Sequence, residues 1–155
     1  MRDKPVLLAS ACLLGVRCRY DGGGTRLDAL ARLMPVCHIV PVCPEQLGGL
    51  PTPRTPSERV GARVLSKNGA DVTDAFHRGA DAACHLARLY GARLALMKAR
   101  SPSCGAGTIY DGSFSGRVAP GDGVTGEALK AMGLDVYTED DLDALLARLS
   151  KENEI

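Results

Sequence analysis

The sequence contains no tryptophan, and its 155 residues include only two phenylalanines and four tyrosines. It also lacks a dominant charge, because nineteen basic side chains against eighteen acidic ones leave a formal charge of +1. Proteins that bind nucleic acid usually present a basic surface and aromatic platforms on which bases stack. The composition therefore disfavours nucleic-acid binding and favours a small or neutral substrate.

Long apolar runs are also missing. Those at 6–11 and 94–97 are far shorter than the about 20 residues that a membrane helix needs. The amino-terminal residues lead into a short strand-like run without a small-residue cleavage site, which argues against a secretory signal. We therefore expect a cytoplasmic protein with no membrane segment. The length fits one domain, which we expect over residues 1–150, followed by a frayed tail at 151–155.

Short apolar segments alternate with segments of helical periodicity along most of the chain. Apolar runs without alternation are typical of parallel strands covered on both faces, and they occur at 6–11, 36–42, 94–97 and 134–137. Apolar residues at helical spacing predict helices at 27–34, 73–90, 127–132 and 142–149. Strands separated by helices favour a parallel sheet with helices on both faces.

Turn residues complete this prediction. An Asn-Gly pair at 68–69 predicts a small hairpin between 62–65 and 70–72. Prolines and glycines make the stretch 46–57 a long loop. We therefore expect an α/β fold, a Rossmann-like three-layer sandwich with a mostly parallel sheet and a small hairpin insertion.

Three of the six cysteines, Cys12, Cys43 and Cys104, stand where a predicted strand gives way to a loop. Because the carboxyl ends of parallel strands line the ligand crevice of an open sheet, these thiols can meet at one place. Thiolates are ligands for iron–sulfur clusters and for zinc, and nearby glycines let backbone amides approach a cluster. A reducing compartment also argues against disulfides. The spacing alone matches neither ferredoxin runs nor zinc knuckles, so convergence stays open on the residues alone.

The other cysteines and the histidines have simpler explanations. Cys84, on the long helix, and Cys37, at a strand start, fit burial as small apolar side chains. Cys18 lies near Cys12 in the sequence and is either a buried residue, a fourth ligand or a redox partner. No histidine lies beside a cysteine loop, so none is placed to activate a hydrolase nucleophile.

The residues around the three strand-end cysteines resemble the domain of unknown function 523 family, whose characterised members are thiouracil desulfidases. The resemblance spans nearly the whole chain. The matching stretches are SACLLG at 10–15, CRYDG at 18–22, PVCPEQLGGL at 41–50, PR at 53–54, GADVT at 69–73, KARSPSCG at 98–105 and IYDG at 109–112.

This resemblance implies a [4Fe-4S] cluster held by Cys12, Cys43 and Cys104, with one iron not ligated by protein. In family members that iron binds the thiocarbonyl sulfur of 2-thiouracil, water replaces the sulfur, and uracil and sulfide leave without net redox change. A soft iron prefers sulfur to oxygen, and a fourth cysteine ligand would block it. The implied substrate is a small thiolated pyrimidine.

The same resemblance marks two polar residues as catalytic. Glu45 follows Cys43 by two residues, and Ser101 precedes Cys104 by three. We expect Glu45 to serve as general base or acid, and Ser101 to donate to the ring or relay a proton.

Other polar residues near the cysteine loops have simpler expected roles. Asp21, Asp111 and Ser103 fit turn formers that cap backbone amides. Basic residues either orient a uracil carbonyl or stay solvated, and these are Arg19, Arg54 and Lys98.

Two alternatives stay open at this point. One keeps the cluster and changes the sulfur donor, for example to a thioamide or a persulfide. The other is a non-catalytic protein in which an iron–sulfur cluster or zinc only ties the three loops together.

Overall fold

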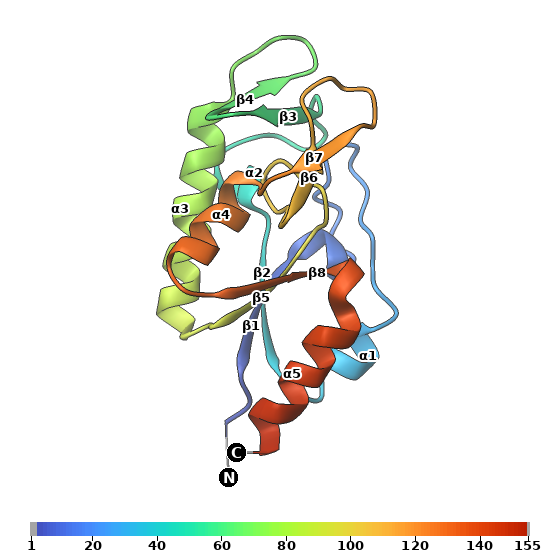
Figure 1. Cartoon of the computed structure of the whole chain (residues 1–155), viewed down its shortest axis with the longest axis vertical. Helices are drawn as coiled ribbons and strands as arrows, with labels where there is room; N and C mark the ends of the chain where they lie inside the picture. The colour runs from blue at the N-terminus through green and yellow to red at the C-terminus, as the bar shows by residue number, and fades with distance from the viewer. Residues whose placement is uncertain (1–2, 155) are drawn as a thin grey trace.

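The computed structural model describes residues 3–154 and has a parallel four-stranded sheet at its centre (Figure 1). The strand order is β2-β1-β5-β8, and every neighbouring pair is parallel. The strands are β1 (Val6–Ser10), β2 (His38–Val42), β5 (Leu94–Met97) and β8 (Asp135–Thr138). The four predicted strands are therefore present, and the expected mostly parallel sheet is confirmed.

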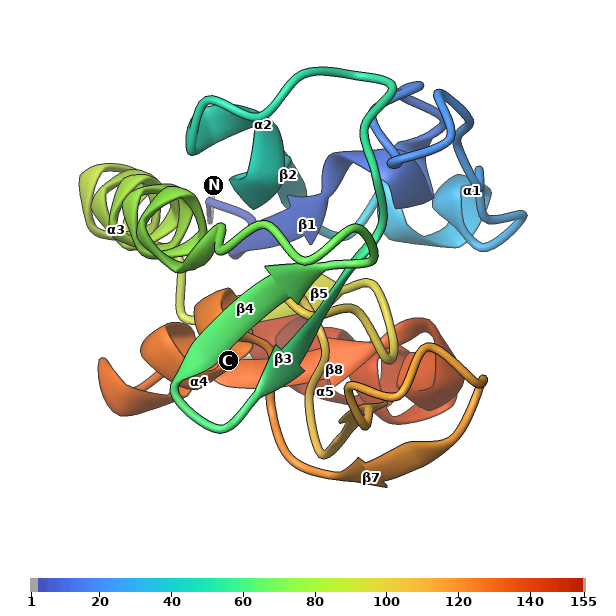
Figure 2. The same cartoon turned by 90° about the horizontal axis from the view of Figure 1, so that it is seen from above.

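Helices cover both faces of this sheet, as the view from above shows (Figure 2). One layer holds α3 (Thr73–Tyr90) and α4 (Val124–Ala131), and the other holds α1 (Leu30–Leu33) and α5 (Leu142–Glu154). The expected three-layer sandwich is confirmed. The helix predicted at 27–34 is only one turn, and α5 continues through the residues 151–154 that were expected to fray. Ile155 lies outside the described residues.

Alternation along the strands builds two separate cores. Successive strand residues point to opposite faces, so Leu7 and Leu96 pack beside Leu145 of α5, whereas Leu8 and Met97 pack in the layer under α3 and α4. All five side chains are fully buried. Each contributes roughly 1.5–3 kcal/mol through loss of apolar surface from water. Apolar residues on both faces explain why these runs lack a hydrophilic alternation.

Small residues on one face of α3 let this helix lie close to its neighbours. Ala80, Ala83 and Ala87 recur at three and four residues and are buried, as the periodicity predicted. Tyr90, predicted on the same face, is instead exposed. The helix ends at Gly91, whose φ of 68° is left-handed and whose amide donates to the last turn.

Two antiparallel hairpins stand above the carboxyl end of the sheet, at the top of Figure 1. They pair β3 (Ser57–Val60) with β4 (Arg63–Ser66), and β6 (Thr108–Tyr110) with β7 (Val118–Pro120). The Asn-Gly turn forms as predicted, and residues 70–72 pair antiparallel with β4 through the bridge from Leu65 to Asp71 and the bond from the Val72 amide to the Val64 carbonyl at 2.9 Å. This second arm stays too short to form a strand, because α3 already begins at Thr73. The long loop predicted at 46–57 supplies β3 at its end, and the second hairpin was not predicted.

Short helical turns complete the described part of the chain. They are η1 (Ala11–Leu14), α2 (Pro44–Leu47) and η2 (Glu139–Asp141). Within residues 3–154, no helix combines the length and the apolar character needed to cross a membrane.

Candidate active site

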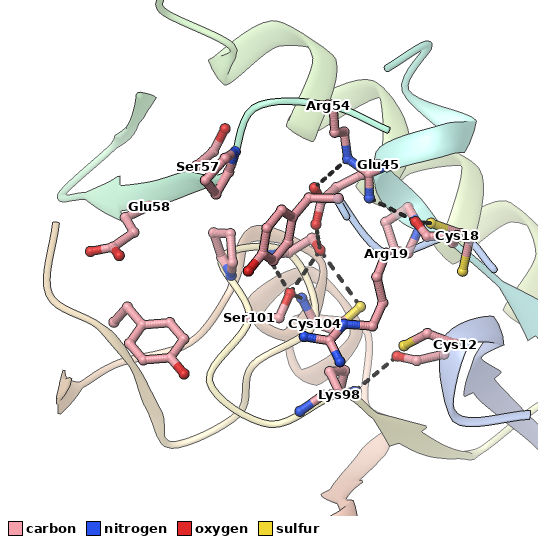
Figure 3. Close-up of a pocket in the computed structure, with 18 of the residues that line it drawn as sticks. Cys12, Cys18, Arg19, Glu45, Arg54, Ser57, Glu58, Lys98, Ser101 and Cys104 are labelled. Carbon is pink, nitrogen blue, oxygen red and sulfur yellow. Dashed lines mark hydrogen bonds and ion pairs between the residues drawn. The ribbon is translucent and has the colours of Figure 1, made fainter. Parts of the chain in front are cut away.

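A cavity of about 370 Å³ opens where β1, β2 and β5 give way to their loops. Four cysteines line it, namely Cys12, Cys18, Cys43 and Cys104. Figure 3 shows three of these thiols around the cavity together with Glu45 and Ser101. The three strand-end cysteines and both predicted catalytic residues therefore border one space.

Cys12 reaches the cavity from a single 3-10 turn directly after β1. Gly15 ends that turn with a φ of 94°, a left-handed conformation that favours glycine, and its amide donates to the carbonyls of Ala11 and Cys12. The chain then folds back, and the amide of Thr25 donates to the Cys12 carbonyl at 2.7 Å. These bonds fix the backbone on which the thiol stands.

Cys43 reaches the cavity from the start of α2. Its backbone is extended, with φ −123° and ψ 96°, and Pro44 follows at the first helical position, where a missing N–H leaves no bond unmade. The amide of Leu47 donates to the Cys43 carbonyl at 2.9 Å and closes the turn. This turn places Glu45 beside the cavity, two residues after the thiol.

Cys104 lies in the loop that follows β5, and the hydroxyl of Ser101 holds that loop. Ser101 Oγ accepts the amide of Ser103 at 3.2 Å and the amide of Cys104 at 3.0 Å. The first amides of α4 donate to the carbonyls of Pro102 and Ser103. The positive end of the α4 dipole therefore faces the loop that carries the thiol.

The pKa values of three cavity thiols, those of Cys18, Cys43 and Cys104, are raised. Burial raises the pKa of the Cys104 thiol to about 12, from an ordinary value of 9.0. A hydrogen bond with Cys12 is the largest effect that raises the pKa of Cys18 to about 11. A hydrogen bond with Cys18 and burial also raise the pKa of Cys43. Because thiols bind metals as thiolates, metal binding here would release protons.

The Glu45 carboxylate is held at both of its oxygens. Oε1 accepts from Nε of Arg54 at 3.0 Å, and Oε2 accepts from the hydroxyl of Ser103 at 2.8 Å. The side chains of Arg54 and Glu45 are only 7% and 15% exposed, so this ion pair is largely withdrawn from water. A charge-assisted pair in such a place fixes the carboxylate beside the cavity.

The two hairpins supply the outer wall of the cavity, which sequence reasoning missed. Tyr110, Phe114 and Lys67 line it, together with Glu58 of β3. Glu58 Oε1 accepts the amides of Gly112 at 2.9 Å and Phe114 at 3.1 Å and so ties one hairpin to the other. The segment 108–120 gave no strand signal because its strands are three residues long and mostly exposed.

The family model described as 2-thiouracil desulfurase matches residues 7–141, a range that contains all of these cavity residues. This chain belongs to the 2-thiouracil desulfurase family.

Two proteins similar to this desulfurase-family chain extend over nearly its whole length. YbbK of Bacillus subtilis (strain 168), an uncharacterised protein, is 37% identical over 151 residues, which is 91% of this chain and 100% of YbbK. The solved structure named [4Fe-4S]-dependent thiouracil desulfidase TudS is 44% identical, with a TM-score of 0.87. That match covers 96% of this chain and 99% of the TudS chain, in agreement with the α/β fold.

The donor set of this desulfurase-family cavity fits an iron–sulfur cluster. Within residues 3–154, no three histidine, cysteine or acidic side chains stand close enough together to hold one metal ion. A four-iron cube binds each thiolate at a different corner, so its ligands stand farther apart than those of one ion. Thiols from three loops around a common cavity, with the Ser103 hydroxyl 3.6 Å from the Cys104 sulfur, suit such a cube.

The serines of this family's SPSC motif divide their roles differently from the sequence prediction. Ser101, rather than Ser103, caps the loop amides, and Ser103 is the serine that bonds Glu45. The two hydroxyls are 3.0 Å apart. Because the hydrogen of Ser103 points to Glu45, Ser101 donates to Ser103, and this uses its hydrogen as well as both lone pairs.

Other residues of this desulfurase-family chain were expected to form turns or to lie away from the site. Asp21 and Asp111 are turn formers as expected, since they accept the amides of Gly23 and Ser113, each at 2.9 Å. Cys37 and Cys84 do not line the described cavity, and neither does any histidine.

The three basic residues considered for a uracil carbonyl all have partners within the protein. Arg19 donates to Thr25 at 2.9 Å, and Lys98 pairs with Glu139 at 2.7 Å. Arg54 pairs with Glu45. Arg19 and Lys98 still border the cavity with part of their side chains.

Proposed function

We propose that this chain is an iron–sulfur-dependent desulfidase that removes sulfur from a small thiolated pyrimidine such as 2-thiouracil. The reaction is a hydrolysis without net redox change: water supplies the oxygen of the new carbonyl, and sulfur leaves as sulfide with the two protons of water. The observation that carries the proposal is one cavity lined by Cys12, Cys43, Cys104 and Glu45, in a chain 44% identical to a [4Fe-4S]-dependent thiouracil desulfidase.

We assign Cys12, Cys43 and Cys104 as the ligands of a [4Fe-4S] cluster, with one iron not ligated by protein. When bound, such a cluster supplies a soft Lewis acid that prefers the sulfur of a thiocarbonyl to the oxygen of a carbonyl. The three loops hold the thiols at one end of the cavity and leave its other end, toward the hairpins, for substrate.

Glu45 is the proposed base for the attacking water and the acid that returns a proton to the departing sulfide. Its carboxylate is anchored by Arg54 and Ser103, and each oxygen keeps a lone pair free for a proton from water. Ser101 acts in this proton transfer through Ser103, whose hydroxyl it orients by donating to it. This proposal places Ser101 behind Ser103 rather than against the ring.

The outer wall of the cavity supports a planar substrate. Tyr20, Tyr110 and Phe114 present aromatic surface there, and rings of this kind stack on heterocycles. Tyr110 and Phe114 come from the second hairpin and Tyr20 from the loop that carries Cys18, so aromatic surface from two segments is available to hold a pyrimidine.

The test is anaerobic purification followed by iron and sulfide analysis and an assay with 2-thiouracil and no reductant. The proposal expects equal amounts of uracil and sulfide to appear. A parallel assay with 4-thiouracil, thionucleosides and a thioamide separates a pyrimidine desulfidase from an enzyme for another thiocarbonyl compound. Full cluster content with no sulfide release from any of these compounds would instead establish a non-catalytic cluster protein.

A further inference from the structure

One hydrogen-bonded chain crosses all three cysteine loops. The guanidinium of Arg54 donates to the carbonyl of Cys18 at 2.9 Å and to Glu45 Oε1 at 3.0 Å. The other Glu45 oxygen accepts from Ser103, the neighbour of Cys104. Figure 3 shows the Arg54 bonds to Glu45 and to Cys18 at one side of the cavity. The side chains of Arg54, Glu45 and Ser103 thus join the loops after β1, β2 and β5.

Arg54 is itself held too firmly to act on a substrate. Its third guanidinium nitrogen donates to the carbonyl of Pro51 at 3.1 Å and to the hydroxyl of Thr52 at 3.0 Å. Its backbone amide donates to the carbonyl of Tyr20 at 2.8 Å. All three guanidinium nitrogens are therefore occupied within the protein, in a fork geometry that a lysine ammonium cannot reproduce.

We propose that Arg54 is the positioning residue of this cavity, which orients the Glu45 carboxylate and ties the cysteine loops into one arrangement before iron arrives. The claim that Arg54 orients Glu45 rests on the function proposed above for Glu45. The claim that Arg54 ties the cysteine loops together concerns the iron-free chain and does not depend on that function. Loss of the guanidinium leaves a largely buried carboxylate without its counter-ion and the Cys18 carbonyl without its donor, so both loops can move.

The first experiment addresses the iron-free protein. Cysteine alkylation by iodoacetamide is followed residue by residue by mass spectrometry in the parent chain and in Arg54→Ala. We expect alkylation of Cys18 and Cys104 to become roughly tenfold faster in Arg54→Ala, because the loops open more often. Unchanged rates at both cysteines overturn the tying role, whether or not the protein is a desulfidase.

The second experiment addresses Glu45 in cluster-loaded protein. We expect Arg54→Ala to lower kcat about 100-fold, while KM changes by less than about threefold, because the lost orientation acts on the transition state. Millimolar guanidinium should restore kcat at least about tenfold, and methylammonium should not, since it lacks the fork. The kcat of Arg54→Lys should fall nearly as far as that of Arg54→Ala.

A matched control is Arg59→Ala. Arg59 forms an equally long ion pair with Glu127 at 3.0 Å, and its side chain is also largely buried, at 14% exposure, but it does not line the cavity. We expect this variant to lose thermal stability and to keep kcat, KM and iron content.

Two results together would reduce Arg54 to a structural residue. In the first, guanidinium does not restore kcat in Arg54→Ala; in the second, Arg59→Ala loses kcat in the same proportion to its loss of stability. A parent protein that loads iron but turns over no thiocarbonyl compound would remove the proposed function and leave the alkylation result to decide the tying role.

Discussion

Gly79 of α3 lies against the main chain of Pro44, the residue that follows Cys43. A Cβ at position 79 would stand 1.8 Å from the Pro44 carbonyl oxygen. From the other side, a Cβ at Gly48 would stand 2.0 Å from the carbonyl oxygen of Ala75. The two helices therefore meet backbone to backbone, at the turn from which a proposed ligand and the proposed base enter the cavity.

Replacing Gly79 with alanine should push α2 away from α3. We expect Gly79→Ala to lose about 1–3 kcal/mol of unfolding free energy, as overpacked sites do, and to hold less iron after reconstitution because the Cys43 loop is displaced. Denaturant unfolding and iron analysis measure both effects. Asp81→Ala, at an exposed position of the same helix, is the control and should change neither. Equal stability of Gly79→Ala and the parent would contradict the close approach.

Glu45→Gln keeps the shape of the side chain and removes its negative charge. If Glu45 transfers the protons of the reaction, this change should lower kcat by about 10²–10⁴-fold while iron and sulfide content stay at parent levels. Glu127→Gln is the control, since Glu127 is 60% exposed and its ion pair with Arg59 lies outside the cavity. Parent-like sulfide release by Glu45→Gln, measured at equal cluster content, would exclude the acid–base role.

Local sequence pattern was enough to predict the layers of the fold. The runs around Leu7 and Leu96 are apolar on both faces because each strand is covered on both, and this burial leaves a direct mark in the sequence. The same holds for the buried face of α3. The β3–β4 pairing was missed because Ser57–Val60 is polar and follows three prolines, so neither periodicity nor turn chemistry marks it.

The places of Cys12, Cys43 and Cys104 at strand ends made their gathering around one cavity possible, the family resemblance implied it, and the structure brings all three to the cavity. The partners of Glu45 were not, because Arg54 and Ser103 meet it through the folding of loops that lie 9 and 58 residues away. Sequence spacing within the SPSC motif likewise does not tell which serine caps the backbone. That choice depends on which hydroxyl the loop turns toward the Cys43 side of the cavity.

Cys37 provides a test of pH dependence away from the proposed ligands. Its thiol is buried and donates to the carbonyl of Leu33 at 3.2 Å, and burial raises its pKa from 9.0 to about 11. The folded state thus keeps this proton where the unfolded chain has lost it. The stability that this proton contributes is complete below about pH 9 and is lost as the pH rises through about 11.

Cys37→Ala should therefore lose less stability than the parent chain over this alkaline range. The measurement is Tm in a series of buffers from about pH 8 to about pH 11, compared between the two proteins, so that titrations common to both cancel. A Tm difference that stays constant across the series would contradict the buried, protonated thiol.

Serine replacements distinguish cluster ligands from buried cysteines. Cys12→Ser, Cys43→Ser and Cys104→Ser should each lose most of the iron and sulfide after anaerobic reconstitution, because a hydroxyl oxygen is a poor ligand for a soft iron site. Cys84→Ser should keep both, since Cys84 belongs to the core under α3 and not to the cavity.

Cys18→Ala tests whether Cys18 is a fourth ligand, one of the three explanations that the sequence left open. If Cys18 bonds Cys12 and Cys43 without being a ligand, the Cys18→Ala protein should bind iron about tenfold more weakly and keep the iron stoichiometry of the parent. Loss of iron in Cys18→Ala as complete as in Cys12→Ser would make Cys18 a ligand, and full iron in Cys43→Ser would overturn the proposed ligand set.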